Sequence, residues 1–219
     1  MSDMIASDTS RAEALIAELS APPVRMGEIK KRAKTIKTDH ELAQQLWASG
    51  VFPARMLAVL ILDRKRLDQA AIDALISDMS DHVEKERSHL SEWLLANQLL
   101  KDKRLVALID TWEHHASPVQ RRLFWYRQAR LRWTGQTPPD NTAYLMDALE
   151  ARLIDEDPKV QWTMSFRAGW IGVHDPQYRD RCIALGKKAG LYKDEIVPSN
   201  CTPNYLPDFI RVEAAKLKR

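Results

Sequence analysis

The apolar residues of the chain recur every three or four positions, which is the spacing of one face of a helix. Sustained alternation of apolar and polar residues, the mark of a half-exposed strand, is not found in any segment. The pattern predicts a series of short helices at residues 9–20, 25–36, 39–49, 53–64, 68–79, 81–100, 102–115, 118–133, 140–155, 158–172, 175–189 and 203–217. The sequence therefore predicts an all-α protein.

Several of these helices are expected to begin at a proline that follows a polar residue. A polar side chain at this position accepts a hydrogen bond from a free backbone amide, and the proline has no amide to leave unpaired. The arrangement occurs at Ser117-Pro118, Asp157-Pro158, Asp175-Pro176 and Thr202-Pro203, and Phe52-Pro53 is a fifth candidate without the polar cap. We expect a helix to start at each of them.

Two of the starts are followed by similar residues. Ser117-Pro118-Val119-Gln120-Arg121 resembles Asp157-Pro158-Lys159-Val160-Gln161, and the two Val-Gln pairs lie 41 residues apart. HEAT and armadillo units repeat at about 40–47 residues. We predict a HEAT-like helical-repeat superhelix of stacked antiparallel helix pairs, forming a single domain over residues 1–219, with an ordinary helical bundle as the alternative.

Composition agrees with a soluble helical protein. Only seven residues are glycine, although sheets joined by hairpins need glycine in their turns. No apolar run is long enough for a membrane span, and the first residues lack the pattern of a secretory signal, so we expect a cytoplasmic protein and a monomer. Cys182 and Cys201 cannot form a disulfide framework, and we expect both to pack as small apolar side chains.

The net charge of +3 is small, but its distribution is uneven. Residues 118–133 contain five arginines and four aromatic residues and no acidic residue. On a helix, Arg121, Trp125 and Arg132 lie near one face. Arginine can bind phosphate with two hydrogen bonds, and aromatic rings can pack on sugars or bases. Alternatively, the aromatic rings belong to the core and the arginines pair with acids on neighbouring helices.

A second basic region covers residues 25–37. It contains Lys30, Lys31 and Lys34 among six basic residues, against the single acid Glu28. Stacked repeats that turn such residues onto one concave face would form a basic groove for a polyanion such as duplex DNA.

The segment 81–100 carries His82, Glu86, His89 and Trp93 along one stripe, with Glu92 on the same broad side. A metal site is one interpretation, but the compact H-E-x-x-H spacing is missing, and we expect no metal. A glycine-rich phosphate loop and a nucleophile elbow are also missing, so we expect no cofactor. A single carboxylate would leave no motif, and the sequence therefore leaves enzyme activity open.

Three stretches resemble a known family. They are residues 39–62, residues 160–172 with Val160-Gln161-Trp162 and Gly169-Trp170-Ile171-Gly172, and residues 186–210 with Gly186-Lys187-Lys188 and Cys201-Thr202-Pro203. Together they are similar to the DNA alkylation repair (AlkD-like) family of HEAT-like repeat DNA glycosylases. The matching residues are mainly packing and capping residues, so they indicate the fold more than the activity.

The resemblance implies a function in DNA repair. Active members carry a Trp-x-x-x-Asp element on a central helix, and its carboxylate supports cleavage of the N-glycosidic bond of an alkylated purine. A nearby anion stabilises the positive charge that develops in such a transition state. When the family's central helix is matched to residues 81–100 of this chain, Glu92 takes the aspartate position and Ser88 the tryptophan position. Arg122 resembles the arginine that contacts phosphate in the family.

We favour a DNA-binding protein of the repair type, with its activity as an alkylpurine DNA N-glycosylase undecided. A DNA-binding protein without catalysis and a helical scaffold for a protein partner are the alternatives. Glu92 is the predicted catalytic residue. The predicted DNA-binding residues are Arg121, Arg122, Arg127, Lys30, Lys31, Lys34, His89, Trp93, Trp125 and Trp170.

Overall fold

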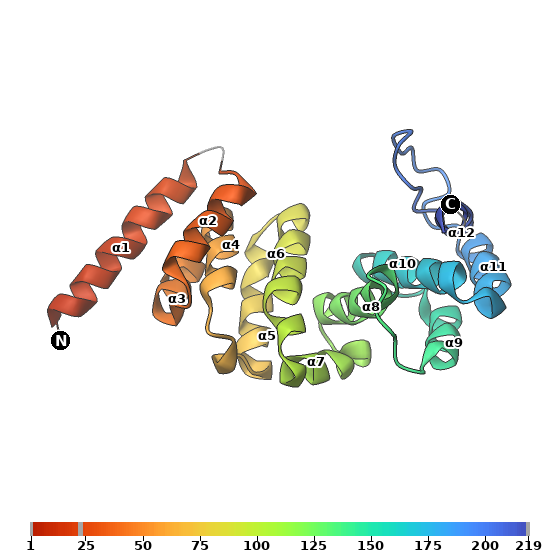
Figure 1. Cartoon of the computed structure of the whole chain (residues 1–219), viewed down its shortest axis with the longest axis horizontal. Helices are drawn as coiled ribbons and strands as arrows, with labels where there is room; N and C mark the ends of the chain where they lie inside the picture. Colours follow the sequence, from red (N-terminus) through yellow and green to blue (C-terminus); the bar gives the residue numbers. More distant parts are fainter. Residues whose placement is uncertain (1, 22–23, 218–219) are drawn as a thin grey trace. The chain divides into compact units, whose positions relative to one another are not determined.

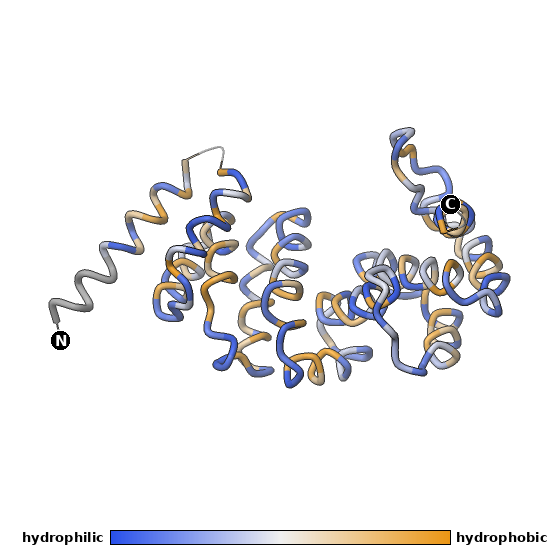
Figure 2. Tube along the Cα trace, viewed as in Figure 1, coloured by the Kyte–Doolittle hydropathy of each residue, from blue (hydrophilic) through white to orange (hydrophobic). Residues whose placement is uncertain are grey.

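The computed structural model describes residues 2–21 and 24–217, and the side chains from residue 10 onward within these ranges. Over this part of the chain the regular secondary structure is helical throughout, with twelve α-helices and no strand (Figure 1). The prediction of an all-α protein is confirmed. Apolar and polar stretches follow one another along the helices, as expected for elements that bury one side (Figure 2).

The chain divides into two compact units, Met1–Leu108 and Ile109–Arg219, and the boundary falls inside α7 (Lys103–Asp110). Unit 1 holds α1 (Ser2–Ser20), α2 (Met26–Ile36), α3 (His40–Ala48), α4 (Phe52–Ile61), α5 (Gln69–Asp78) and α6 (Glu84–Asn97). Unit 2 holds α8 (Pro118–Trp133), α9 (Thr142–Arg152), α10 (Pro158–His174), α11 (Arg179–Ala189) and α12 (Leu206–Lys216). Single 3₁₀ turns are η1 (Arg64–Arg66), η2 (Met79–Asp81), η3 (Leu99–Lys101), η4 (Trp112–His114) and η5 (Pro176–Tyr178). A single domain over the whole chain stays a prediction.

Most helix starts follow the local rules read from the sequence. Asp39 caps α3 by accepting a hydrogen bond from the amide of Leu42 at 3.1 Å. Asp157 caps α10 in the same way, from the amide of Lys159 at 2.8 Å. Ser117 precedes α8, whose first residue is Pro118, although the Ser117 side chain forms no capping bond. The predicted starts of α8 and α10, and that of α4 at Phe52, are confirmed.

The predicted start at Thr202-Pro203 is wrong. The last helix, α12, begins at Leu206, and Pro207 is the proline of its first turn. The Thr202 hydroxyl instead donates to the carboxylate of Glu213 on that helix. The fourth pair, Asp175-Pro176, opens the 3₁₀ turn η5 before α11 begins.

In unit 1 the most buried helix is α4, which packs against α2, α3 and α6. Even its arginine, Arg55, is 4% exposed. The guanidinium donates to the main-chain oxygens of Trp47 and Asp78, at 3.0 and 2.6 Å, and lies over the Trp47 ring. These bonds compensate for burying the cation and fix the positions of α3 and the end of α5 around α4.

In unit 2, α10 is the central element and packs against α8, α11 and α12. Two glycines allow α12 to approach it closely. A Cβ atom on Gly169 would lie 2.6 Å from the Phe209 ring, and one on Gly172 would lie 2.6 Å from the Cδ1 atom of Ile210. A larger residue at Gly169 would have to displace the Phe209 ring, and one at Gly172 would have to move the end of the Ile210 side chain.

The two cysteines differ. Cys182 is buried between α11 and α10, and burial raises the pKa of its thiol to about 12. Cys201 is exposed, so the expectation that it packs as a core residue is wrong. Within the described ranges, no helix combines the length and the apolar character needed to cross a membrane.

Candidate nucleic-acid interface

In unit 1, α6 and α2 bring three of the predicted residues together. The indole nitrogen of Trp93 donates to the main-chain oxygen of Met56 at 3.1 Å, which fixes the half-buried ring against α4. The Lys30 ammonium lies 5.3 Å from the centre of that ring. The exposed His89 ring is 6.2 Å from Trp93 and 5.8 Å from Phe52. Lysine, tryptophan and histidine thus form one continuous surface.

Glu92 lies on α6 directly before Trp93, and its side chain is half-buried. Ser88, which we predicted to occupy the family's tryptophan position, is also half-buried and donates to Glu84. Glu92 and Trp93 are consecutive on α6, so their side chains leave the helix in different directions, and the roles of both remain predictions.

Two residues of the stripe that suggested a metal site, His82 before α6 and Glu86 on it, bind each other. Nδ1 of His82 is 2.9 Å from a carboxylate oxygen of Glu86, and the His82 side chain is only 7% exposed. Its ring packs edge-on against Phe52 at 5.9 Å. Among the residues that the structure describes, no three His, Cys, Asp or Glu side chains are grouped to hold a metal ion.

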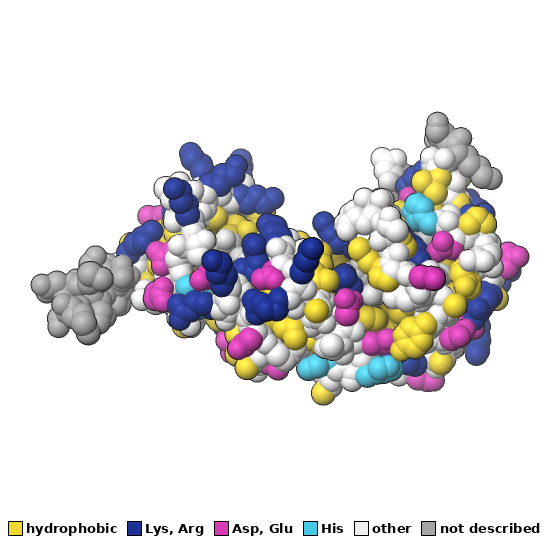
Figure 3. Space-filling view, turned by 60° about the horizontal axis from the view of Figure 1, so that its bottom comes forward, with side chains coloured by type: hydrophobic (Ala, Val, Ile, Leu, Met, Phe, Trp, Pro, Cys, Tyr) yellow, Lys and Arg dark blue, Asp and Glu magenta, His cyan; other side chains and the backbone are white. Residues whose placement is uncertain are grey.

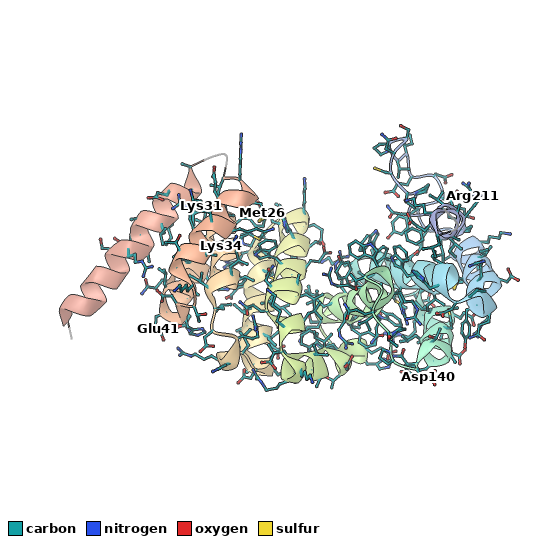
Figure 4. The ribbon with its side chains drawn as sticks, viewed as in Figure 1. Met26, Lys31, Lys34, Glu41, Asp140 and Arg211 are labelled. Atoms are coloured by element: carbon teal, nitrogen blue, oxygen red, sulfur yellow. The ribbon has the colours of Figure 1, made fainter. Side chains whose placement is uncertain are left out.

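The lysines of α2 lie at the surface of unit 1. Lys30, Lys31 and Lys34 are exposed, and none of the three forms an ion pair with a residue of the described ranges. Arg32, by contrast, pairs with Glu18 of α1. Figure 4 labels Lys31 and Lys34 on α2, and Figure 3 shows lysine and arginine side chains gathered over unit 1 on the face it draws.

In unit 2, the face of α8 that carries Arg121, Trp125 and Arg132 is largely buried. Arg121 donates to the main-chain oxygen of His115 at 2.7 Å and forms an ion pair with Glu156 at 2.8 Å. Trp125 has no exposed surface. Arg127 is 8% exposed and paired with Asp110. These three predicted contacts to DNA therefore offer little or no free surface.

The ion pair of Arg121 affects its partner. Burial alone would raise the pKa of Glu156, but hydrogen bonds from Arg121 and from the backbone amide of Asp157 outweigh it, and the pKa is lowered. Arg152 binds the second carboxylate oxygen at 3.2 Å. The carboxylate is therefore held ionised between two arginines, which joins α8, α9 and the start of α10.

The neighbouring face of α8 is open, and sequence reasoning missed most of it. Arg122 lies over the Trp162 ring of α10, at 5.1 Å from its centre, and donates to the main-chain oxygen of Lys159 at 2.9 Å. One turn later is Tyr126, which is half-buried. Arg130 and Trp133 follow, with the guanidinium 5.8 Å from the ring centre and the ring 48% exposed.

A matching stripe runs along α10. Trp162, Phe166 and Trp170 follow one another at intervals of four residues, so they share one side of the helix. Trp162 and Phe166 are half-buried, with ring centres 5.2 Å apart and planes 11° apart. Trp170, a predicted DNA contact, is 8% exposed and packs edge-on against Phe209.

We define the arginine–aromatic face as Arg122, Tyr126, Arg130 and Trp133 of α8 together with Trp162 and Phe166 of α10. Phe166 is its centre, with its ring 6.1 Å from both Tyr126 and Trp133. The four-residue spacing on each helix was the signal available in the sequence. It was hidden because Phe124, Trp125 and Tyr126 are consecutive and place aromatic rings on several sides of α8.

Comparisons with known proteins agree with the fold. A family model for DNA alkylation repair enzyme matches residues 18–183. A solved structure, described as a new family of proteins related to the HEAT-like repeat DNA glycosylases with affinity for branched DNA structures, has a TM-score of 0.67 and 17% identity; the match covers 94% of this chain and 88% of that chain. No curated protein sequence matches. The prediction of a HEAT-like helical-repeat fold is confirmed.

Proposed function

The chain belongs to the DNA alkylation repair enzyme family, and on that premise we propose that it binds DNA through the exposed lysines of α2 and through Arg122 of α8. Lys30, Lys31 and Lys34 carry this proposal, because they are exposed and unpaired within the described ranges and lie on adjoining turns of one helix. Each cation that reaches a phosphate releases counterions from the DNA, which makes the affinity depend on salt.

The aromatic neighbours of these cations support binding to nucleic acid. Lys30 lies over Trp93 in unit 1, and Arg122 lies over Trp162 in unit 2. A cation beside a partly exposed ring can meet a phosphate while the ring packs against a sugar or base. The related solved structure is of a protein with affinity for branched DNA, which points to the same class of partner.

A salt titration tests this proposal. A fluorescent duplex with one abasic-site analogue and an undamaged duplex are titrated with the protein over a range of salt concentrations. We expect the logarithm of the affinity to fall steeply with the logarithm of the salt concentration. Replacing Lys31 and Lys34 together by alanine should make the slope shallower by about 2, at about 0.9 per phosphate.

The matched control uses lysines outside the proposed site. Lys187 and Lys188 are equally exposed, at the end of α11, and their double alanine variant has the same net charge as the Lys31/Lys34 variant. We expect its salt slope to stay within about 0.5 of the wild-type slope. Equal slopes for the two double variants, or no binding at low salt, would contradict the proposal and leave the basic residues to the fold or to a protein partner.

We further propose that Glu92 stabilises positive charge on a DNA substrate during release of an alkylated purine. The specific observation is that α6 keeps a half-buried carboxylate directly before Trp93. Glu92→Gln keeps the shape and removes the charge, so it should abolish base release and change DNA affinity less than about twofold. Base release is measured on a methylated duplex. Unchanged release in this variant excludes the role of Glu92, and no release by the wild type identifies a DNA-binding protein without this activity.

A further inference from the structure

We propose that the arginine–aromatic face stacks against unpaired bases, so that the protein prefers DNA in which bases are exposed at a fork or a single-stranded arm. This rests on the proposed function, because it assumes that DNA is bound. It adds the feature of the DNA that is recognised and the residues that recognise it.

The first observation is that these rings keep part of their surface exposed although the core beneath them is complete. Trp125 and Leu123 of α8 and Met164 of α10 are fully buried. Trp133 nevertheless leaves 48% of its surface exposed, and Tyr126 and Trp162 are half-buried. Large apolar side chains that gather at the surface of a soluble protein usually mark a binding site.

The second observation is the mutual orientation of the rings. The plane of Phe166 makes angles of 11° with Trp162 and 17° with Tyr126, and Tyr126 and Trp162 differ by 24°. The ring centres are 5.2 to 6.4 Å apart. Three nearly parallel planes suit the flat face of a nucleobase. In a paired duplex, the neighbouring base pairs already cover that face, whereas an unpaired base presents it.

The third observation is the charge around the rings. Arg122 lies over Trp162, and Arg130 lies over Trp133. Arg130 forms no ion pair within the described part of the chain. The segment 118–133 also contains no acidic residue. Cations beside stacking rings fit a single strand, whose phosphates follow its bases at short intervals.

Binding experiments compare two DNA probes. One is a forked duplex with two unpaired arms, and the other is a fully paired duplex with the same number of phosphates, so that electrostatic attraction is matched. We expect the wild-type protein to bind the fork more tightly. The variant Tyr126→Ala/Trp133→Ala should bind the fork about 10-fold more weakly, because each base stacked on a ring contributes substantially to affinity. Its affinity for the paired duplex should change less than about twofold.

The control is Tyr144→Ala, which removes an aromatic ring of α9 that is 55% exposed and lies outside the face. It should leave the preference for the fork unchanged. Thermal melting of each variant, followed by circular dichroism, checks that it is folded. The rescue variant Trp133→Phe keeps a ring at that position and should retain most of the preference.

A second measurement does not depend on any variant. The fluorescent base 2-aminopurine is placed in an unpaired arm of the fork, and its emission should fall when the wild-type protein stacks on it. No change in emission on binding, equal affinity for the two probes, or an equal loss on both probes in the double variant would overturn the inference. If the wild type binds neither probe, the proposed function itself fails, so the two failures are distinguishable.

Discussion

Two faces of α8, rotated about 100° from one another, contain the same residue types and have different surroundings. One face carries Trp125, which is fully buried, and Arg121, whose side chain is 16% exposed and paired inside unit 2. The other carries Arg122 and Tyr126, which adjoin solvent and the rings of α10. A shift of a single residue in the sequence therefore separates a structural face from a candidate binding face.

The difference lies in what each face meets. The arginines of the buried face form ion pairs with carboxylates: Arg121 pairs with Glu156, and Arg132 pairs with Asp175. The open face meets aromatic rings, and its arginines lie over Trp162 and Trp133. An arginine paired with a carboxylate inside the protein is committed to the fold, whereas Arg130 lies over a ring at the surface and keeps donors for a ligand.

The largest effect on stability is expected from Arg121→Ala. Its partner Glu156 is 9% exposed, and the variant leaves that carboxylate with Arg152 as its remaining cation. Breaking a buried ion pair on one side should lower the free energy of unfolding by about 3 kcal/mol. Urea unfolding measures the change. Arg130→Ala is the matched control on the open face, and an equal loss in both variants would remove the distinction between the faces.

The second effect concerns the support behind the open face. In Gly169→Ala, the added methyl would lie 2.6 Å from the Phe209 ring, which packs against Phe166. Overpacking should cost about 2 kcal/mol of unfolding free energy, and it should also weaken binding of the forked DNA. Gly27→Ala in α2 has open space around its new methyl, so it should not destabilise the protein. A Gly169 variant as stable as the wild type would show that α12 adjusts freely.

A third effect appears in acid. The pKa of Glu156 is lowered in the folded protein, against an ordinary value of 4.5. Its ion pairs therefore contribute stability that is present above pH 4.5 and is lost as the pH falls through the lowered pKa. Glu156→Gln should make the melting temperature less dependent on pH in that range. The control is Glu41→Gln: the hydrogen bond from Arg66 also lowers the pKa of Glu41, but that pair is exposed and screened by solvent, so its removal should change the profile less. Parallel pH profiles for Glu156→Gln and the wild type would contradict this.

The smallest effect separates charge from shape on the open face. Arg122→Lys keeps one cation but loses the planar group over Trp162. We expect DNA affinity to fall about threefold with an unchanged salt slope, whereas Arg122→Ala should make the slope shallower by about 0.9. Identical salt slopes for the alanine and lysine variants would show that Arg122 does not contact phosphate.

Local sequence rules predict the start of a helix well where the residues of a single turn decide it. The Asp157-Pro158 pair is an example, because cap and proline act within a single turn. Thr202-Pro203 has the same form, but its hydroxyl is taken by Glu213, which is eleven residues away in sequence. A competing tertiary hydrogen bond of this kind cannot be read from neighbouring residues.

The orientation of α8 shows a second limit of prediction from the local sequence. Its aromatic residues cover several sides of the helix, so periodicity alone allows either face to be buried. The choice depends on the positions of Glu156 and Trp162, which belong to later segments of the chain. The exposure of Lys31 and Lys34 is simpler to predict, since a helix face with several lysines and the single acid Glu28 is usually solvated.

The distribution of the seven tryptophans gives the protein an internal optical probe. Trp112 and Trp125 have no exposed surface, so their emission should report on unfolding. Trp133 is about half exposed, and its emission should respond to a molecule that covers the arginine–aromatic face. Quenchers dissolved in the solvent should reach Trp133 and not Trp112 or Trp125. Unlabelled DNA can therefore be followed in solution by the light that the protein itself emits.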